Sequence, residues 1–220
     1  MKLTMLTLYD LPVSSYGCKI RVVMTHKQLD WRSVPPPNGY GSPAYCKIIP
    51  SGTIPAIDQD GFRLADSEAI AEYLDEIITS PPMLPVNPQD RARIREISRF
   101  HDTRLEPVLR AYFAHVSPET RDQNFVTSNT ALLQKRLDQL GQIANPAPLL
   151  FSNQLTIADC GFVASFALIT TLQDILGFDL AIPEPLQAYE RVLVAHPSVA
   201  AESAAYYDAL SSWAAAKLRG

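Results

Sequence analysis

Two short segments of this chain combine residue types that could together bind a peptide. In the first, Pro55 interrupts a strand-like run over residues 54–57. Because proline has no N–H for a sheet ladder, it belongs on an edge strand or beside a bend. An edge strand keeps unpaired N–H and C=O groups, which can pair with an extended peptide.

The second segment begins at Asp66 and Ser67, which precede an apolar run with helical spacing up to Ile78. The N–H groups at a helix N-terminus can bind a carboxylate, and Asp66 can pair with an ammonium group. A strand edge for a peptide backbone and a helix end for an amino-acid head group predict a site for a short peptide.

Two hydroxyl groups lie near the N-terminus, between a predicted strand over residues 5–9 and a predicted helix over residues 18–27. Ser14 and Ser15 occupy the turn that joins them. A hydroxyl group there can donate a hydrogen bond to a thiolate, and a helix N-terminus favours negative charge. Each feature alone could be an ordinary cap or edge proline, but all three together are harder to explain in that way.

The three segments resemble the cytosolic glutathione S-transferase family, and in particular a bacterial-looking member of its serine-type zeta, theta and delta classes. The resemblance implies glutathione as co-substrate and no metal. It implies a cis peptide bond before Pro55, and it implies that the backbone of Ile54 pairs with the cysteinyl part of glutathione. Asp66 and Ser67 would then hold the γ-glutamyl end.

The resemblance also places Ser14 at the catalytic position. A free thiol has a pKa of about 8.5, and only its thiolate is a good nucleophile. Ser14 would donate a hydrogen bond to the glutathione sulfur and favour the thiolate. Ser15 is a further glutathione-binding candidate, and Ser15 and Tyr16 are weaker candidates for the catalytic position.

The thiolate would attack a small apolar electrophile, as in conjugation, dehalogenation or ether cleavage in detoxification. The helical part of the chain would supply the wall of that second site. Candidates by resemblance are Tyr112, Phe113 and Trp213, although each alone is more readily explained by core or interface packing.

Two departures from the family pattern bear on function. Relatives often hold the glycyl carboxylate of glutathione with a His, Lys or Gln at the positions of Gly52 and Thr53, so Asn38, Tyr40 or Lys47 would have to replace that contact. Zeta-class enzymes isomerise maleylacetoacetate and carry Gln, Asn and Arg where this chain has Ser165, Leu168 and Thr171. A glutathione-dependent isomerase and a non-catalytic protein-binding scaffold therefore remain alternatives to glutathione transfer.

Composition limits the other possibilities. The chain has 220 residues and a net charge of −4 without a basic block, so nucleic-acid binding is unsupported. We expect no membrane span and no signal peptide. The cysteines at positions 18, 46 and 160 are odd in number and widely spaced, which indicates a reducing cytoplasm and neither a metal site nor a disulfide framework. We expect the side chain of Cys18 to be buried and to pack in the core.

The pattern of elements predicts an α/β thioredoxin-like domain over residues 1–80, a linker over 81–88 and an all-helical domain over 89–220. Thr156 and Asp159 have the spacing of a capping box at the start of a long helix. The resemblance implies a homodimer through the helix from about residue 89 to 115. His101, Asp102 and Arg104 could reach the neighbouring subunit's site from there.

Overall fold

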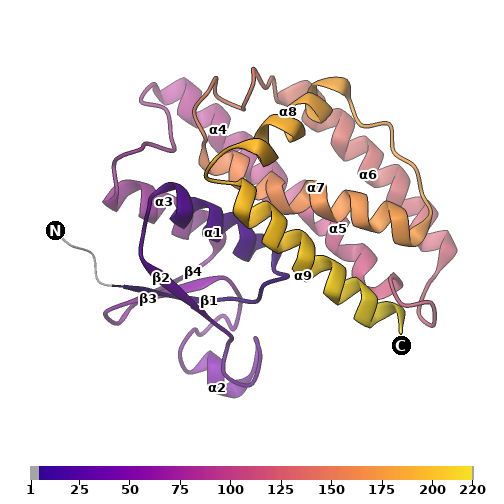
Figure 1. Cartoon of the computed structure of the whole chain (residues 1–220), viewed down its shortest axis with the longest axis horizontal. Coiled ribbons are helices and arrows are strands. Elements are labelled where there is room, and N and C mark those ends of the chain that lie inside the picture. Colours follow the sequence, from indigo (N-terminus) through magenta and orange to yellow (C-terminus); the bar gives the residue numbers. More distant parts are fainter. Residues whose placement is uncertain (1–4, 220) are drawn as a thin grey trace.

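A four-stranded mixed sheet forms the N-terminal part of the computed structural model, which describes residues 5–219 (Figure 1). The strands are β1 (Leu6–Tyr9), β2 (Trp31–Val34), β3 (Ala56–Gln59) and β4 (Phe62–Ala65), in the order β2-β1-β3-β4. β1 runs parallel to β2, and β3 runs antiparallel to both β1 and β4. The ends of the predicted domains, residues 1–4 and 220, lie outside the described residues.

Three helices accompany the sheet: α1 (Ser15–His26), α2 (Pro43–Cys46) and α3 (Ser67–Ile77). α1 connects the two parallel strands, as a crossover between parallel strands requires. α1 and α3 lie between the sheet and the C-terminal helices, whereas α2 lies at the opposite side (Figure 1). This arrangement confirms the predicted thioredoxin-like domain.

The hairpin between β3 and β4 has the turn that its sequence predicts. Asp60 and Gly61 have φ values of 53° and 88°, which are those of the two-residue turn that Asp-Gly favours. Two positions were predicted for Pro55, an edge strand or a bend, and only the bend is correct. β3 pairs on both sides and is not an edge strand, so Pro55 lies at the bend before it. The Ile54–Pro55 peptide bond is cis, as the resemblance implied.

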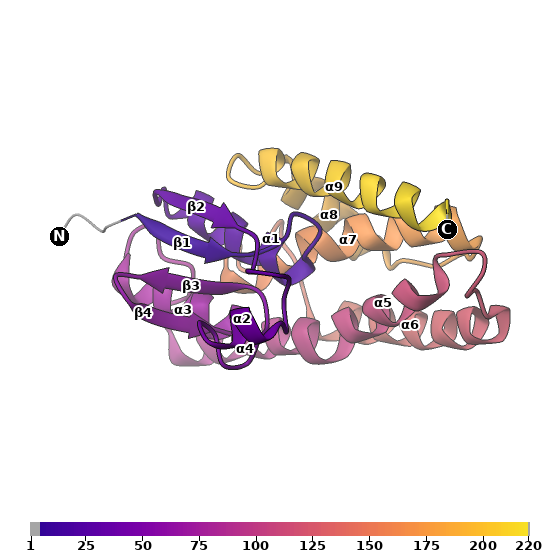
Figure 2. The same ribbon diagram turned by 90° about the horizontal axis from the view of Figure 1, so that it is seen from below.

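The rest of the chain is helical. Its elements are α4 (Pro88–Phe100), the π-helical turn η1 (His101–Leu105), α5 (Glu106–Ala111), the 3₁₀ turn η2 (Tyr112–His115), α6 (Gln123–Ile143), α7 (Ile157–Leu176), α8 (Glu184–Ala195) and α9 (Ala200–Leu218). Figure 2 shows the sheet at one end of the molecule with α4 alongside it, and α5, α6 and the C-terminal end of α9 at the other end. One continuous hydrophobic core includes Leu8 from β1, Cys18 from α1 and Leu172 from α7.

One helix bears on the expectation of no membrane-spanning segment. Helix α7 is long and apolar enough to cross a membrane by length and composition. In the fold, however, 72% of that segment is buried inside the protein. α1 packs along it, so the apolar composition of α7 is that of a central core helix.

Pro107 explains why the predicted long helix after residue 89 is not a regular α-helix. Proline has no N–H and its ring clashes with the carbonyl four residues earlier. The helix widens into η1 just before this residue, and the N–H of Glu106 bonds the carbonyl of His101 five residues back. The carbonyl of Asp102 therefore loses its α-helical partner, while Pro107 has no N–H to replace it.

The start of α7 is fixed by the predicted capping box. Asp159 is fully buried and accepts hydrogen bonds from the backbone N–H and the hydroxyl group of Thr156, at 2.7 and 2.6 Å. It also accepts from the hydroxyl group of Tyr189 at 2.8 Å and from the N–H of Leu150 at 3.3 Å. One carboxylate thus joins the α7 cap, the preceding loop and α8.

We expect Asp159→Ala to lower the free energy of unfolding by about 3–5 kcal/mol, because it leaves several buried donors without an acceptor. Urea unfolding followed by circular dichroism measures this loss. The matched control is Asp122→Ala, which removes the exposed N-cap of α6 and should cost about 1 kcal/mol. Equal losses for the two variants would contradict the account of α7.

Candidate functional site

A cavity of about 440 Å³ lies where the sheet domain meets the helical domain. It is lined by residues from three regions, namely the start of α1, the loops that flank β3 and β4 with the start of α3, and the α4–η1 helix. The lining residues are Tyr16, Ser51, Thr53, Ile54, Pro55, Ala65, Asp66, Ser67, Arg99 and Asp102. The structure therefore brings the predicted residues at positions 54, 55, 66 and 67 together in one cavity.

Asp66 and Ser67 form the helix end of this cavity. Oδ1 of Asp66 accepts hydrogen bonds from the N–H groups of Glu68 and Ala69, at 3.0 and 3.1 Å. Asp66 has a φ of 84°, which is unusual for a residue other than glycine. This strained residue turns the chain sharply from β4 into α3 and leaves Ser67 at the first position of the helix, a combination that often marks a binding site.

Ile54 and Pro55 form the extended side of the cavity. Among the hydrogen bonds of residues 5–219, none involves the main-chain N–H or C=O of Ile54, so both can pair with a peptide. The preceding loop is fixed by Tyr45, whose hydroxyl group donates to the carbonyl of Thr53 at 2.9 Å. Gly52 has a φ of 65° and packs closely against Cys46, so a side chain at this position would be strained.

Ser14 is half-buried at the N-cap of α1. Its hydroxyl oxygen accepts the N–H of Gly17 at 3.0 Å, which leaves the hydroxyl proton to be donated elsewhere. The cavity lining includes Tyr16 from this turn and does not include Ser14. Ser15 points in another direction, because its buried hydroxyl group donates to Glu106 at 2.6 Å.

Tyr16 bridges the two domains above the cavity. Its hydroxyl group donates to the carbonyl of Asp102 at 2.8 Å, the carbonyl that Pro107 leaves without a helical partner. The guanidinium group of Arg110 lies 5.5 Å from the centre of the Tyr16 ring. Burial, with Glu106 and Asp102 nearby, raises the pKa of Tyr16 well above its usual range, so this side chain remains a neutral hydroxyl group.

Lys19 lies fully buried beneath the cavity. Its ammonium group contacts Oε2 of Glu68 at 2.5 Å and Oδ2 of Asp102 at 3.0 Å. Ser98 donates to the same Glu68 oxygen at 2.6 Å, and His101 bonds the other oxygen of Asp102 at 2.8 Å. The cluster joins α1, α3 and the α4–η1 helix.

Lys19 and Glu68 are not among the residues that the sequence predicted for the site. One signal could have found Lys19. It lies in a helix whose apolar residues point in all directions, so the whole helix is buried and a charge on it must be paired. Nothing in the sequence alone identifies its partners.

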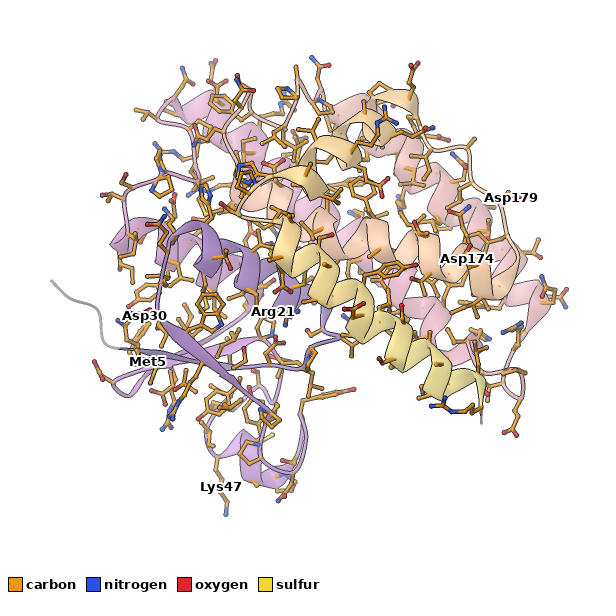
Figure 3. The ribbon with its side chains drawn as sticks, viewed as in Figure 1. Met5, Arg21, Asp30, Lys47, Asp174 and Asp179 are labelled. Atoms are coloured by element: carbon orange, nitrogen blue, oxygen red, sulfur yellow. The ribbon has the colours of Figure 1, made fainter. Side chains whose placement is uncertain are left out.

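Arg21 fixes the turn that carries Ser14. It forms a buried ion pair with Asp10 and bonds Glu202 of α9 at 2.7 Å. Its guanidinium group also donates to the carbonyl of Pro12 at 3.0 Å. Figure 3 shows Arg21 between α1 and α9. Burial raises the pKa of Asp10 to about 6, although Arg21 opposes that effect.

The residues predicted to form the electrophile site separate into two groups. Phe113 and Trp213 have ring centres 4.9 Å apart and line a second cavity of about 620 Å³ between η2 and α9. Arg110 stands 5.7 Å from the Phe113 ring, between this cavity and Tyr16. Tyr112, by contrast, is fully buried and stacks on Phe178, so the structure places it in the core and away from both cavities.

Other residues named from the sequence lie away from the first cavity. Lys47 points outward from the end of α2 (Figure 3), and Asn38 and Tyr40 are exposed and do not line it. His101 is buried and bonds Ser165 at 2.8 Å, so it faces the core of its own chain. Asp102 lines the cavity of its own chain.

Among residues 5–219, no group of three or more His, Cys, Asp or Glu side chains is placed to hold a metal ion.

Comparison with known proteins agrees with this geometry. Residues 8–82 match the family described as glutathione S-transferase, N-terminal domain. This part of the chain is similar to that family. The matched residues include the Ser14 turn, the cis-Pro55 bend and the start of α3.

Similarity extends over the whole chain at the level of the fold. A solved glutathione transferase from Bombyx mori superposes with a TM-score of 0.82 at 22% identity, over 98% of this chain and 99% of that chain. The chain therefore has the glutathione S-transferase fold. A glutathione S-transferase from Pseudomonas putida is 24% identical over 82% of this chain and 83% of that protein.

A maleylacetoacetate isomerase from Rhizobium meliloti is 35% identical over 104 residues. The match covers 46% of this chain and 49% of that protein, so the chain spans about half the length of this relative.

Gly17→Ala tests whether the Asp10–Arg21 pair fixes the turn. A Cβ atom at this position would lie 1.9 Å from Oδ1 of Asp10, so the carboxylate and its partner must move. We expect the free energy of unfolding to fall by about 3 kcal/mol. In the control, Gly141→Ala, the new Cβ would lie 3.3 Å from Pro183 and gain helix propensity, so the change should stay within about 1 kcal/mol. Urea unfolding measures the free energy of unfolding of both variants. Similar losses of stability in the two would contradict the role of the Asp10–Arg21 pair.

Proposed function

We propose that this protein is a glutathione S-transferase, which binds glutathione in the cavity beside α3 and activates its thiol for attack on an apolar electrophile. The observation that carries the proposal is the cavity itself. It joins a free main-chain edge at Ile54, a cis-Pro55 bend and the helix end at Ser67. These groups are complementary to an extended peptide with an amino-acid head group.

The proposed orientation of glutathione follows from these groups. The γ-glutamyl carboxylate binds at the N-terminus of α3 beside Ser67, because the helix N–H groups favour an anion. The ammonium group lies near Asp66, and the cysteinyl backbone pairs with Ile54. Ser51 and Thr53, whose hydroxyl groups are 2.9 Å apart, line the cavity. They are candidates for binding the glycyl end in place of Asn38, Tyr40 and Lys47.

Ser14 is the proposed donor to the sulfur. Its oxygen already accepts the N–H of Gly17, so its own proton is available to the thiolate. The N-terminus of α1 adds a favourable field for negative charge. The sulfur then attacks an electrophilic carbon, a C–S bond forms, the leaving group departs with the bonding electrons and the thiol proton passes to solvent. Ser15, bonded to Glu106, supports this turn rather than the sulfur.

The second cavity, with Phe113 and Trp213 on its wall, is the proposed electrophile site. Aromatic walls favour apolar and aromatic substrates. We further propose a homodimer, as the resemblance implies, and a cytoplasmic location, as the three widely spaced cysteines indicate.

A glutathione-dependent isomerase is the second candidate, because relatives with that name match about half of the chain. The residues in place of the expected Gln, Asn and Arg are unfavourable for it. Ser165, Leu168 and Thr171 are all buried in α7, and none is a cation that could receive a substrate carboxylate. Turnover of maleylacetoacetate by the purified protein, faster than conjugation, would favour the isomerase over the transferase.

We expect Ser14→Ala to lower kcat/KM for glutathione conjugation of a chlorodinitrobenzene by about 100-fold or more. Removing one preorganised hydrogen-bond donor to an anion in an active site typically has an effect of this size. Ser14→Thr keeps both the cap and the hydroxyl group and should retain most of the activity. Circular dichroism checks that both variants fold, because the lost cap alone costs about 1 kcal/mol.

Tyr16→Phe separates the two candidate donors. It removes the hydroxyl group that lines the cavity but leaves Ser14 in place, so the thiol should still be activated. If Tyr16→Phe abolished conjugation while Ser14→Ala preserved it, Tyr16 would be the donor. If neither variant nor the unaltered protein conjugated or bound glutathione, the non-catalytic scaffold would be the better account.

A further inference from the structure

Lys19 has no role in the chemistry proposed above, yet it is the most deeply buried charge near the ligand cavity. The side chain is fully buried on α1. Its ammonium group contacts Glu68 and Asp102, and Oγ of Ser98 lies 3.3 Å away. Asp102 lines the cavity, and Glu68 directly follows Ser67 at its helix end.

The charges in this cluster do not balance without Lys19. Burial lowers the pKa of Lys19, but Asp102 and Glu68 together raise it above its usual value, so the ammonium group stays charged. Burial raises the pKa of Asp102, but His101 and Lys19 bring it down to about 2. Oε1 of Glu68 is buried and has no hydrogen-bond partner among residues 5–219. Arg99 approaches Asp102 only to 3.7 Å, with about half of its side chain exposed.

The position of Glu68 makes this balance matter for the ligand. Its carboxylate belongs to the first turn of α3, the turn whose N–H groups would bind the γ-glutamyl carboxylate. Unpaired carboxylates behind that turn would repel the ligand's carboxylate and offset the helix end. A buried cation between them removes that repulsion.

We infer that Lys19 is a positioning residue for glutathione, which neutralises Glu68 and Asp102 and so allows the N-terminus of α3 to accept the α-carboxylate of the γ-glutamyl group. The inference rests on the proposed function. Lys19 does not touch the ligand, and its effect passes through the two carboxylates. The effect of Lys19 on ligand binding should therefore depend on whether the ligand carries the α-carboxylate.

The test compares glutathione with γ-aminobutyryl-cysteinyl-glycine, which lacks only that carboxylate. Calorimetric titration gives the ratio of the two dissociation constants for each variant. We expect Lys19→Met to weaken glutathione binding by about tenfold or more, which is the size of effect that one close opposite charge has. The dissociation constant of the analogue should stay nearly unchanged. In Lys19→Met/Glu68→Gln one repelling charge is gone, so most of the preference for glutathione should return. Lys19→Arg should keep it.

Lys27→Met is the matched control. Lys27 is a second buried lysine, at the C-cap of α1, and pairs with Asp75 near the linker, away from the cavity. Its loss should lower stability but leave the ratio of dissociation constants unchanged. If Lys19→Met does not fold, Lys19→Gln, which also removes the charge, takes its place in the same comparison.

Two results would overturn the inference. One is a ratio of the two dissociation constants in Lys19→Met, or in Lys19→Gln if only that folds, that equals the ratio of the unaltered protein. The other is a change of the same size in Lys27→Met. Either would show that Lys19 serves only the fold. Failure of the proposed function would be visible separately, because the unaltered protein would then bind neither ligand.

Discussion

A lysine ammonium group buried between two carboxylates is the interaction on which the site depends. Lys19 comes from α1, Glu68 from α3 and Asp102 from the helical domain, so a single cation joins the two domains at the ligand cavity. Removing one partner of a buried ion pair typically costs about 3–5 kcal/mol. This requirement for pairing fixes how α1, α3 and η1 lie relative to one another, and with them the residues that line the cavity.

Pro107 supplies the second constraint. It widens the helix at η1 and leaves the carbonyl of Asp102 to accept the hydroxyl group of Tyr16. The same turn places the side chain of Asp102 beside Lys19. One proline in the helical domain thus frees a carbonyl that binds a tyrosine from the other domain, whereas a regular helix would satisfy that carbonyl internally.

The sequence predicted the features that depend on local chemistry. The Asp60-Gly61 turn, the capping box of Asp159 and the domain order follow from residue types at short spacing, and the structure has all three. The sequence did not show that β3 is an inner strand or that Lys19 and Glu68 meet, because these depend on contacts between distant segments. Tyr112 shows the same limit. Its neighbour Phe113 faces a cavity, but its own ring is in the core.

The central claim is that the cavity binds glutathione as its thiolate. The most direct measurement is the ultraviolet absorbance of the thiolate while glutathione is titrated into the purified protein near neutral pH, where free glutathione is mostly protonated because its thiol pKa is about 8.5. The account predicts a saturable thiolate signal with one glutathione for each chain. Saturable binding without that signal would contradict thiol activation, and the absence of any binding would contradict the glutathione site itself.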